Sequence, residues 1–201
     1  METSQSQDFD EKRSMQLIHE MLQVSKRKFQ SDGILMIVWG WIMTIHYLLS
    51  FVLGNSNLTN QLRHGIKYVI TGLIFIGFAY TLFYILKQRK KVQTYIGVSL
   101  RYVWVAMFFS LVLVNVIQFR VLNEINFELQ HPIFMVIIAF AIVVTGGILR
   151  YKLIVFGGVA FALLALISSH LPLNNQLLLE SIAWLIAFVI PGHILYSKRN
   201  R

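Results

Sequence analysis

Two polar side chains that can bind a ligand lie within long apolar stretches of this chain. His46 falls in the stretch 33–53, and Asn115 falls in the stretch 102–119. An imidazole and a carboxamide each offer a hydrogen-bond donor and an acceptor. Polar groups within membrane-spanning stretches are costly and often functional. We therefore expect a small polar ligand-binding pocket around these two residues, ending near the indoles of Trp39 and Trp41.

The same two residues also have a purely structural interpretation. His46 and Asn115 can hydrogen-bond each other or a backbone carbonyl and so hold neighbouring helices together. Other polar residues fall at a similar level, in the outer halves of their stretches: Thr71, Gln118, Ser168 and Glu180. The sequence leaves the structural and the ligand-binding interpretations open.

Several kinds of chemistry are disfavoured by what the apolar stretches lack. None of them has Asp, Lys or Arg near its centre, which argues against a proton-driven pump, a voltage sensor and carboxylate-based intramembrane hydrolysis. The sequence has no cysteine, so disulfides, iron–sulfur clusters and thiolate metal sites are excluded. No nucleotide-binding or nucleophile motif occurs. We expect neither an enzyme nor a cofactor.

Three further histidines, His64, His131 and His170, begin or end apolar stretches on the predicted outer side. Histidines in such positions can bind zinc or respond to external pH. Their spacing imposes no tetrahedral geometry, so we expect no metal site. Haem is not expected either, because no second histidine on another stretch is predicted at the level of His46.

The apolar stretches themselves predict an all-α membrane protein. Of the 201 residues, 56% are hydrophobic and 13% are charged, whereas soluble domains contain about 25% charged residues. A helix of about 20 apolar residues crosses a bilayer. We predict a polytopic bundle of six transmembrane helices, at 33–53, 66–86, 102–119, 132–149, 153–169 and 177–196.

The basic residues predict the orientation of these six spans. If both chain ends are cytosolic, all but three of the 18 Lys and Arg residues fall on the inner side, and only Arg63, Lys67 and Arg120 stay outside. Inner segments of membrane proteins carry such an excess. The net charge of +9 thus reflects orientation and not nucleic-acid binding. We expect a multi-pass membrane protein with both chain ends in the cytosol.

An amphipathic helix is predicted before the first span, at residues 8–30. Its apolar face contains Ile18, Met21, Leu22 and Phe29, and the basic run 26–28 can meet anionic lipid headgroups. The helix either lies on the bilayer or docks a cytosolic protein or a second copy of the chain.

The predicted organisation of the whole chain is a cytosolic tail and helix (1–32), a transmembrane domain (33–197) and a basic tail (198–201).

Small residues predict one close helix pair. Gly146-Gly147 and Gly157-Gly158 lie at equal distances from the turn between the fourth and fifth spans, and small residues let membrane helices approach closely. In the last span, Pro191-Gly192 predicts a kink or a local unwinding.

The chain resembles a family of uncharacterised six-span bacterial inner-membrane proteins. The residues that carry this resemblance are structural and cover nearly the full length: Leu17-Ile18 to Lys28, Trp39-Gly40-Trp41, Tyr102-Val-Trp104, Thr145-Gly-Gly-Ile-Leu-Arg-Tyr-Lys152 and Ile190-Pro-Gly192. The resemblance implies a bacterial inner-membrane location and no particular activity.

Our first functional hypothesis is a non-enzymatic membrane protein that signals or assembles through its N-terminal helix. The alternative is a small-solute transporter or channel built around His46 and Asn115.

Overall fold

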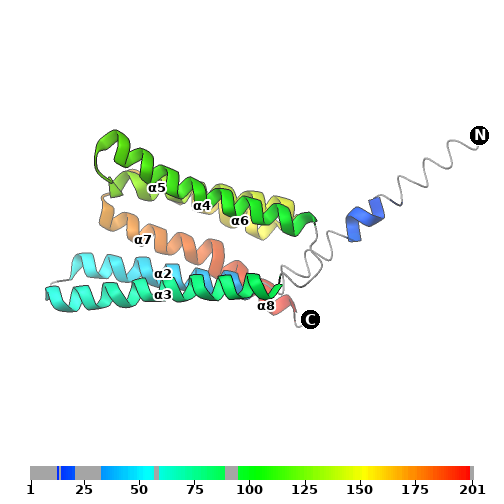
Figure 1. Ribbon diagram of the computed structural model, residues 1–201, viewed down its shortest axis with the longest axis horizontal. Coiled ribbons are helices and arrows are strands. Elements are labelled where there is room, and N and C mark those ends of the chain that lie inside the picture. The colour runs from blue at the N-terminus through cyan, green and yellow to red at the C-terminus, as the bar shows by residue number, and fades with distance from the viewer. Residues whose placement is uncertain (1–12, 14, 21–32, 57–58, 89–94, 200–201) are drawn as a thin grey trace, which may run out of the picture.

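The computed structural model describes residues 13, 15–20, 33–56, 59–88 and 95–199 (Figure 1). Every regular element among these residues is a helix. The helices, in chain order, are α2 (Gly33–Asn55), α3 (Asn60–Gln88), α4 (Tyr95–Leu122), α5 (Phe127–Ile148), α6 (Lys152–Ser168), α7 (Leu173–Trp184), the π-helical turn η1 (Leu185–Val189) and α8 (Ile190–Arg199).

Five helical segments of the described chain are long and apolar enough to cross a membrane: 34–55, 60–83, 97–122, 127–148 and the continuous segment 173–197. The protein is therefore a multi-span integral membrane protein in contact with the lipid bilayer. Helix α6 is apolar but has only 17 residues. At 1.5 Å per residue it is about 26 Å long, near the lower limit for a membrane-spanning helix.

Successive passes of the chain run antiparallel, so the helix ends gather at two ends of the bundle (Figure 1). Helix α2 begins, and α8 ends, at the same end, which we call the proximal end. The distal end is where the helices α2, α4 and α6 finish and where α3, α5 and α7 start. The pass formed by α7, η1 and α8 lies between α2 and α6, while α3 packs on α2 and α4 packs on α5.

The tightest packing lies around α5, α6 and the last pass. Met135 and Phe161 are 0% exposed, and Leu195 is 1% exposed. Helices α3 and α4 are peripheral by contrast, and they leave large side chains such as Phe75 and Phe109 exposed. A membrane protein can expose such side chains to lipid tails, which are as apolar as the side chains themselves.

Glycines set the spacing of the α5–α6 hairpin. A Cβ atom on Gly146 would lie 2.7 Å from the backbone nitrogen of Val155, and one on Gly158 would lie 2.7 Å from a methyl group of Val143. These contacts confirm the predicted close pair. The second glycine of the first pair behaves differently, because a Cβ on Gly147 would meet nothing within 4 Å.

The predicted irregularity of the last span occurs one turn before its proline. The π-helical turn η1 ends at Val189, and α8 then continues through Pro191. At this level α2 approaches closely, because a Cβ on Gly40 would lie 2.8 Å from a methyl group of Val189.

Only a short part of the predicted N-terminal helix is described. Residues 15–20 are helical, and Met15, Leu17 and Ile18 are exposed. Met21, Leu22, Phe29 and the basic run 26–28 lie outside the described residues.

Candidate functional site

A buried carboxyl group pairs with a histidine in the distal half of the bundle. The Nδ1 atom of His131, on α5, lies 2.6 Å from the Oε2 atom of Glu180, on α7. Glu180 is 0% exposed, and the side chain of His131 is 18% exposed. Such a pair is costly to place inside a membrane protein, and buried ionisable residues there commonly mark a ligand or ion pathway.

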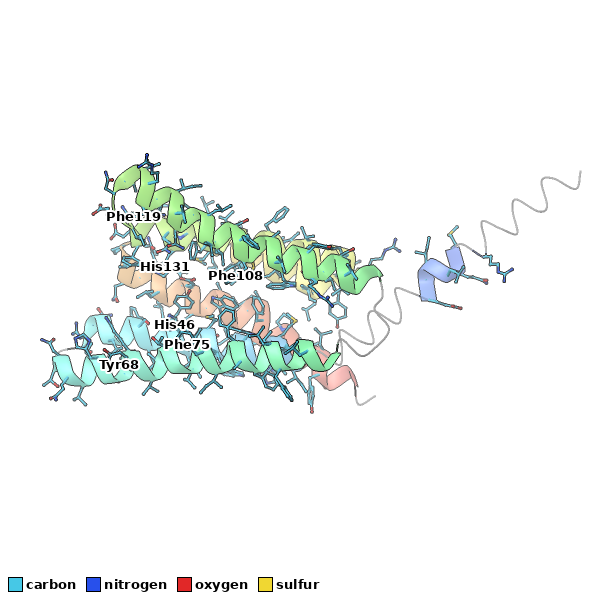
Figure 2. All side chains as sticks on the ribbon, viewed as in Figure 1. His46, Tyr68, Phe75, Phe108, Phe119 and His131 are labelled. Atoms are coloured by element: carbon cyan, nitrogen blue, oxygen red, sulfur yellow. The ribbon has the colours of Figure 1, made fainter. Side chains whose placement is uncertain are left out.

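Two aromatic side chains of α2 complete this cluster. The ring of Tyr47 lies 6.0 Å from the ring of His131 and nearly perpendicular to it, and it packs edge-on against His46 at 4.8 Å. Tyr47 also lies against the carboxyl group of Glu180, with which it makes both an electrostatic and a side-chain hydrogen-bond interaction. We call these four residues the distal cluster: His46, Tyr47, His131 and Glu180. Figure 2 marks the two histidines in this half of the bundle.

The starts of α5 and α7 place the cluster residues at the same level. The side chain of Asn126 accepts a hydrogen bond from the backbone N–H of Leu129 and so caps α5. The amide nitrogen of Gln176 donates to the carbonyls of Leu171 and Glu128, at 2.9 and 3.1 Å. Gln176 thereby ties the first turn of α7 to α5, and Glu180 follows four residues later on the same face.

Several buried polar atoms of the described distal half have no protein partner. A polar atom without a partner is costly where no bulk water can reach it, so each such atom needs an explanation. One of them is the carboxyl oxygen Oε1 of Glu180, a residue that is 0% exposed. The others are Thr44 Oγ1, His46 Nδ1, Arg63 Nε, both amide atoms of Gln118, Ser168 Oγ, Asn174 Oδ1 and Gln176 Oε1.

Asn115 serves a structural role near the cluster. Its amide donates to the carbonyl of Leu111 at 2.9 Å, and its oxygen accepts from the amide of Gln130 at 2.6 Å. The backbone hydrogen bond agrees with the structural interpretation of Asn115. The other bond joins α4 to Gln130 of α5, so the direct bond between Asn115 and His46 that we considered is not formed.

The two tryptophans predicted to line the pocket lie elsewhere. Trp39 donates from its indole nitrogen to the hydroxyl of Thr81 at 2.8 Å and packs edge-on against Phe78, so it joins α2 to α3. Trp39 is also about two helical turns nearer the proximal end than His46. Trp41 is 43% exposed. Of the four predicted pocket residues, only His46 belongs to the distal cluster.

Hydropathy predicts a fourth span that starts at residue 132, just after His131, and it does not pair Tyr47 with Glu180. In the structure α5 begins at Phe127, so His131 lies inside the helix. The expectation that no second histidine shares the level of His46 was therefore wrong. One available signal was the four-residue spacing of Gln176 and Glu180, which puts two polar side chains on one helix face.

The other outer histidines do not join the cluster. His64 and His170 are exposed at the distal end, and Nδ1 of His170 lies 3.0 Å from the carbonyl of Leu166. Within the described parts of the chain, no group of three His, Asp or Glu residues is arranged to hold a metal ion.

No protein-family model, curated protein or solved structure matches this chain. Its function is therefore inferred from the side chains of the distal cluster and from their position in the bundle.

Proposed function

We propose that this protein is a non-enzymatic transporter or channel for a small polar solute, which enters from outside the cell and binds at the distal cluster. The observation that carries this proposal is the buried carboxyl group of Glu180: His131 and Tyr47 are its partners, and its oxygen Oε1 still has no hydrogen-bond partner. A charged side chain at the centre of a bilayer costs about 3 kcal/mol on insertion scales. A purely structural pair would be expected to use both carboxyl oxygens, whereas a binding site leaves one for the solute.

The proposed entry from outside follows from a six-span orientation. We take α6 as a short sixth span, since it runs antiparallel to α5 over most of the length of α5 (Figure 1). Basic residues near the proximal helix ends include Arg101, Arg150 and Lys152. An excess of basic residues favours the cytosolic side. The proximal end is then cytosolic, the distal cluster lies in the outer half, and the resemblance to bacterial inner-membrane proteins agrees with this location.

Cysteine labelling tests whether the cluster is open to outside water. The chain has no cysteine of its own, so His46→Cys creates a single thiol in the cluster. We expect a charged, membrane-impermeant methanethiosulfonate reagent to modify this thiol from outside, because such reagents react with the thiolate in water. The matched control is Ile45→Cys, at the neighbouring position. The side chain of Ile45 is 41% exposed on the lipid-facing surface, so a thiol at this position should stay unmodified.

Two results would contradict the proposal. One is a folded His46→Cys variant that resists the reagent as completely as Ile45→Cys does. The other is modification that occurs only when the reagent reaches the proximal side.

A second function is favoured by the exposed residues of the N-terminal helix. Met15, Leu17 and Ile18 are 73%, 50% and 56% exposed, and large apolar side chains outside a membrane span are suited to contact with lipid or protein. In this hypothesis the helix recruits a cytosolic protein or pairs with a second copy, and anionic lipid headgroups hold its basic run.

A further inference from the structure

The charge balance of the distal cluster restricts what Glu180 can bind. A carboxyl group hydrogen-bonded to an imidazole shares one proton with it, either as carboxylate and imidazolium or as carboxylic acid and neutral imidazole. Both forms have no net charge. A net charge at a fully buried site is costly, so a cation that binds beside His131 and Glu180 is best compensated if one proton leaves.

The groups that face Glu180 supply no such cation. Helix α2 presents His46 and Tyr47, and α5 presents His131. Helix α6 has only Lys152 as a titratable side chain, at its proximal start, and η1 has none. His193, on α8, contacts the carbonyl of Val189. The described Lys and Arg residues form no ion pair with Glu180, whose partner is His131.

We propose that Glu180 exchanges its shared proton for one monovalent cation. The solute of the proposed transporter is then a monovalent cation. The cation binds the free oxygen Oε1 as the pair releases one proton, and His131 remains neutral. One positive charge enters and one leaves, so no bond is oxidised or reduced and the cluster stays neutral. A divalent ion would leave an uncompensated positive charge, and the described residues hold no set of three His, Asp or Glu for it.

This inference rests on the proposed function but has its own test. The full-length protein is reconstituted into acid-loaded liposomes that contain a pH-sensitive dye. Sodium, potassium or tetramethylammonium chloride is then added outside at matched osmolarity. We expect at least one of these cations to make the liposome interior more alkaline, because protons leave as the cation enters. The identity of the active cation distinguishes an alkali ion from an organic ammonium ion.

The decisive variant is Glu180→Gln, whose amide has no acidic proton to exchange. We expect it to lose the exchange completely, to the level of protein-free liposomes. Glu124→Gln, which changes an exposed carboxylate beyond the end of α4, should exchange as the unchanged protein does. An imposed membrane potential should leave the rate unchanged, because one-for-one exchange moves no net charge.

A second variant keeps the proposal testable if Glu180→Gln does not fold. In His131→Gln the amide can still donate a hydrogen bond to Glu180, but it cannot accept the shared proton. Exchange should then require a more alkaline external solution than in the unchanged protein. An unshifted pH profile would contradict the role of the pair.

The two proposals fail in different ways. If His46→Cys reacts from outside but none of the three cations releases protons, or if Glu180→Gln exchanges at the unchanged rate, the exchange through Glu180 is disproved, whereas the proposed water-accessible binding site is not. If the thiol of His46→Cys does not react with the reagent from outside, the proposed function itself is contradicted.

Discussion

At the scale of single residues, the partner of each histidine determines what the imidazole can do. His170 and His193 each contact a backbone carbonyl four residues earlier on their own helix, and such a contact only stabilises a helical turn. His131 instead contacts a carboxyl group from another helix. An imidazole next to a carboxyl group can accept or return a proton. The absence of Asp, Lys and Arg near the span centres disfavours a proton-driven protein, but it has no bearing on a pair of His and Glu in the distal half.

A residue-scale prediction concerns Ile18, which is exposed on the N-terminal helix. If two copies of the chain pair through this helix, Ile18→Cys should form a cross-linked dimer under mild oxidation in native membranes. The control is Glu20→Cys, which lies two residues from Ile18 and therefore about 160° away from it around the helix. The measurement is the dimer fraction on a non-reducing gel. Equal cross-linking of both variants, or none for Ile18→Cys, would contradict pairing through this face.

At the scale of helices, the α5–α6 hairpin depends on which side of α5 carries a glycine. Gly146 faces the backbone of α6, whereas Gly147 is exposed and a Cβ atom there would meet nothing within 4 Å. Both are helical, so alanine changes their intrinsic helix propensity equally. Any difference between the two alanine variants therefore reports the contact with α6.

The corresponding prediction compares Gly146→Ala with Gly147→Ala. We expect Gly146→Ala to destabilise the protein by about 1–3 kcal/mol, since the added methyl group forces α6 to move. Gly147→Ala should leave the melting temperature unchanged or slightly raised. Thermal unfolding in detergent, followed by circular dichroism, measures both. A similar loss for both variants would show that the glycines matter for reasons other than helix approach.

At the scale of the whole molecule, the position of the helix ends links orientation to function. The described chain starts its first span and ends its last one at the proximal end (Figure 1). The same end carries Arg150 and Lys152 between α5 and α6. If this end is cytosolic, the distal cluster can only receive its solute from outside unless the bundle rearranges.

Topology mapping with single cysteines tests this orientation. Glu124→Cys, at the distal end, should react with an impermeant maleimide in intact cells. Ser197→Cys, near the end of α8, should react only after the membrane is permeabilised. The readout is the labelled fraction of each purified variant. The reverse pattern would place the distal cluster on the cytosolic side and overturn the proposed route of entry.

The sequence by itself determined that this protein lies in a membrane. Hydropathy is a local property, and a bilayer accepts only helices that satisfy their own backbone hydrogen bonds, so the long spans follow from composition alone. The glycine pairs also predicted the close hairpin, because small side chains let two helix backbones approach each other closely. The fold class and the positions of five spans were therefore readable before any tertiary structure.

Only the tertiary structure brought Tyr47, His131 and Glu180 to one place. Spans that are apolar on all sides give little signal for their rotation about the helix axis, so the sequence could not tell which polar side chains face each other. Their depth depended on helix starts at Phe127 and Leu173, each about one turn earlier than hydropathy suggested. Helix packing therefore determines which residues form the cluster, because its members come from distant parts of the chain.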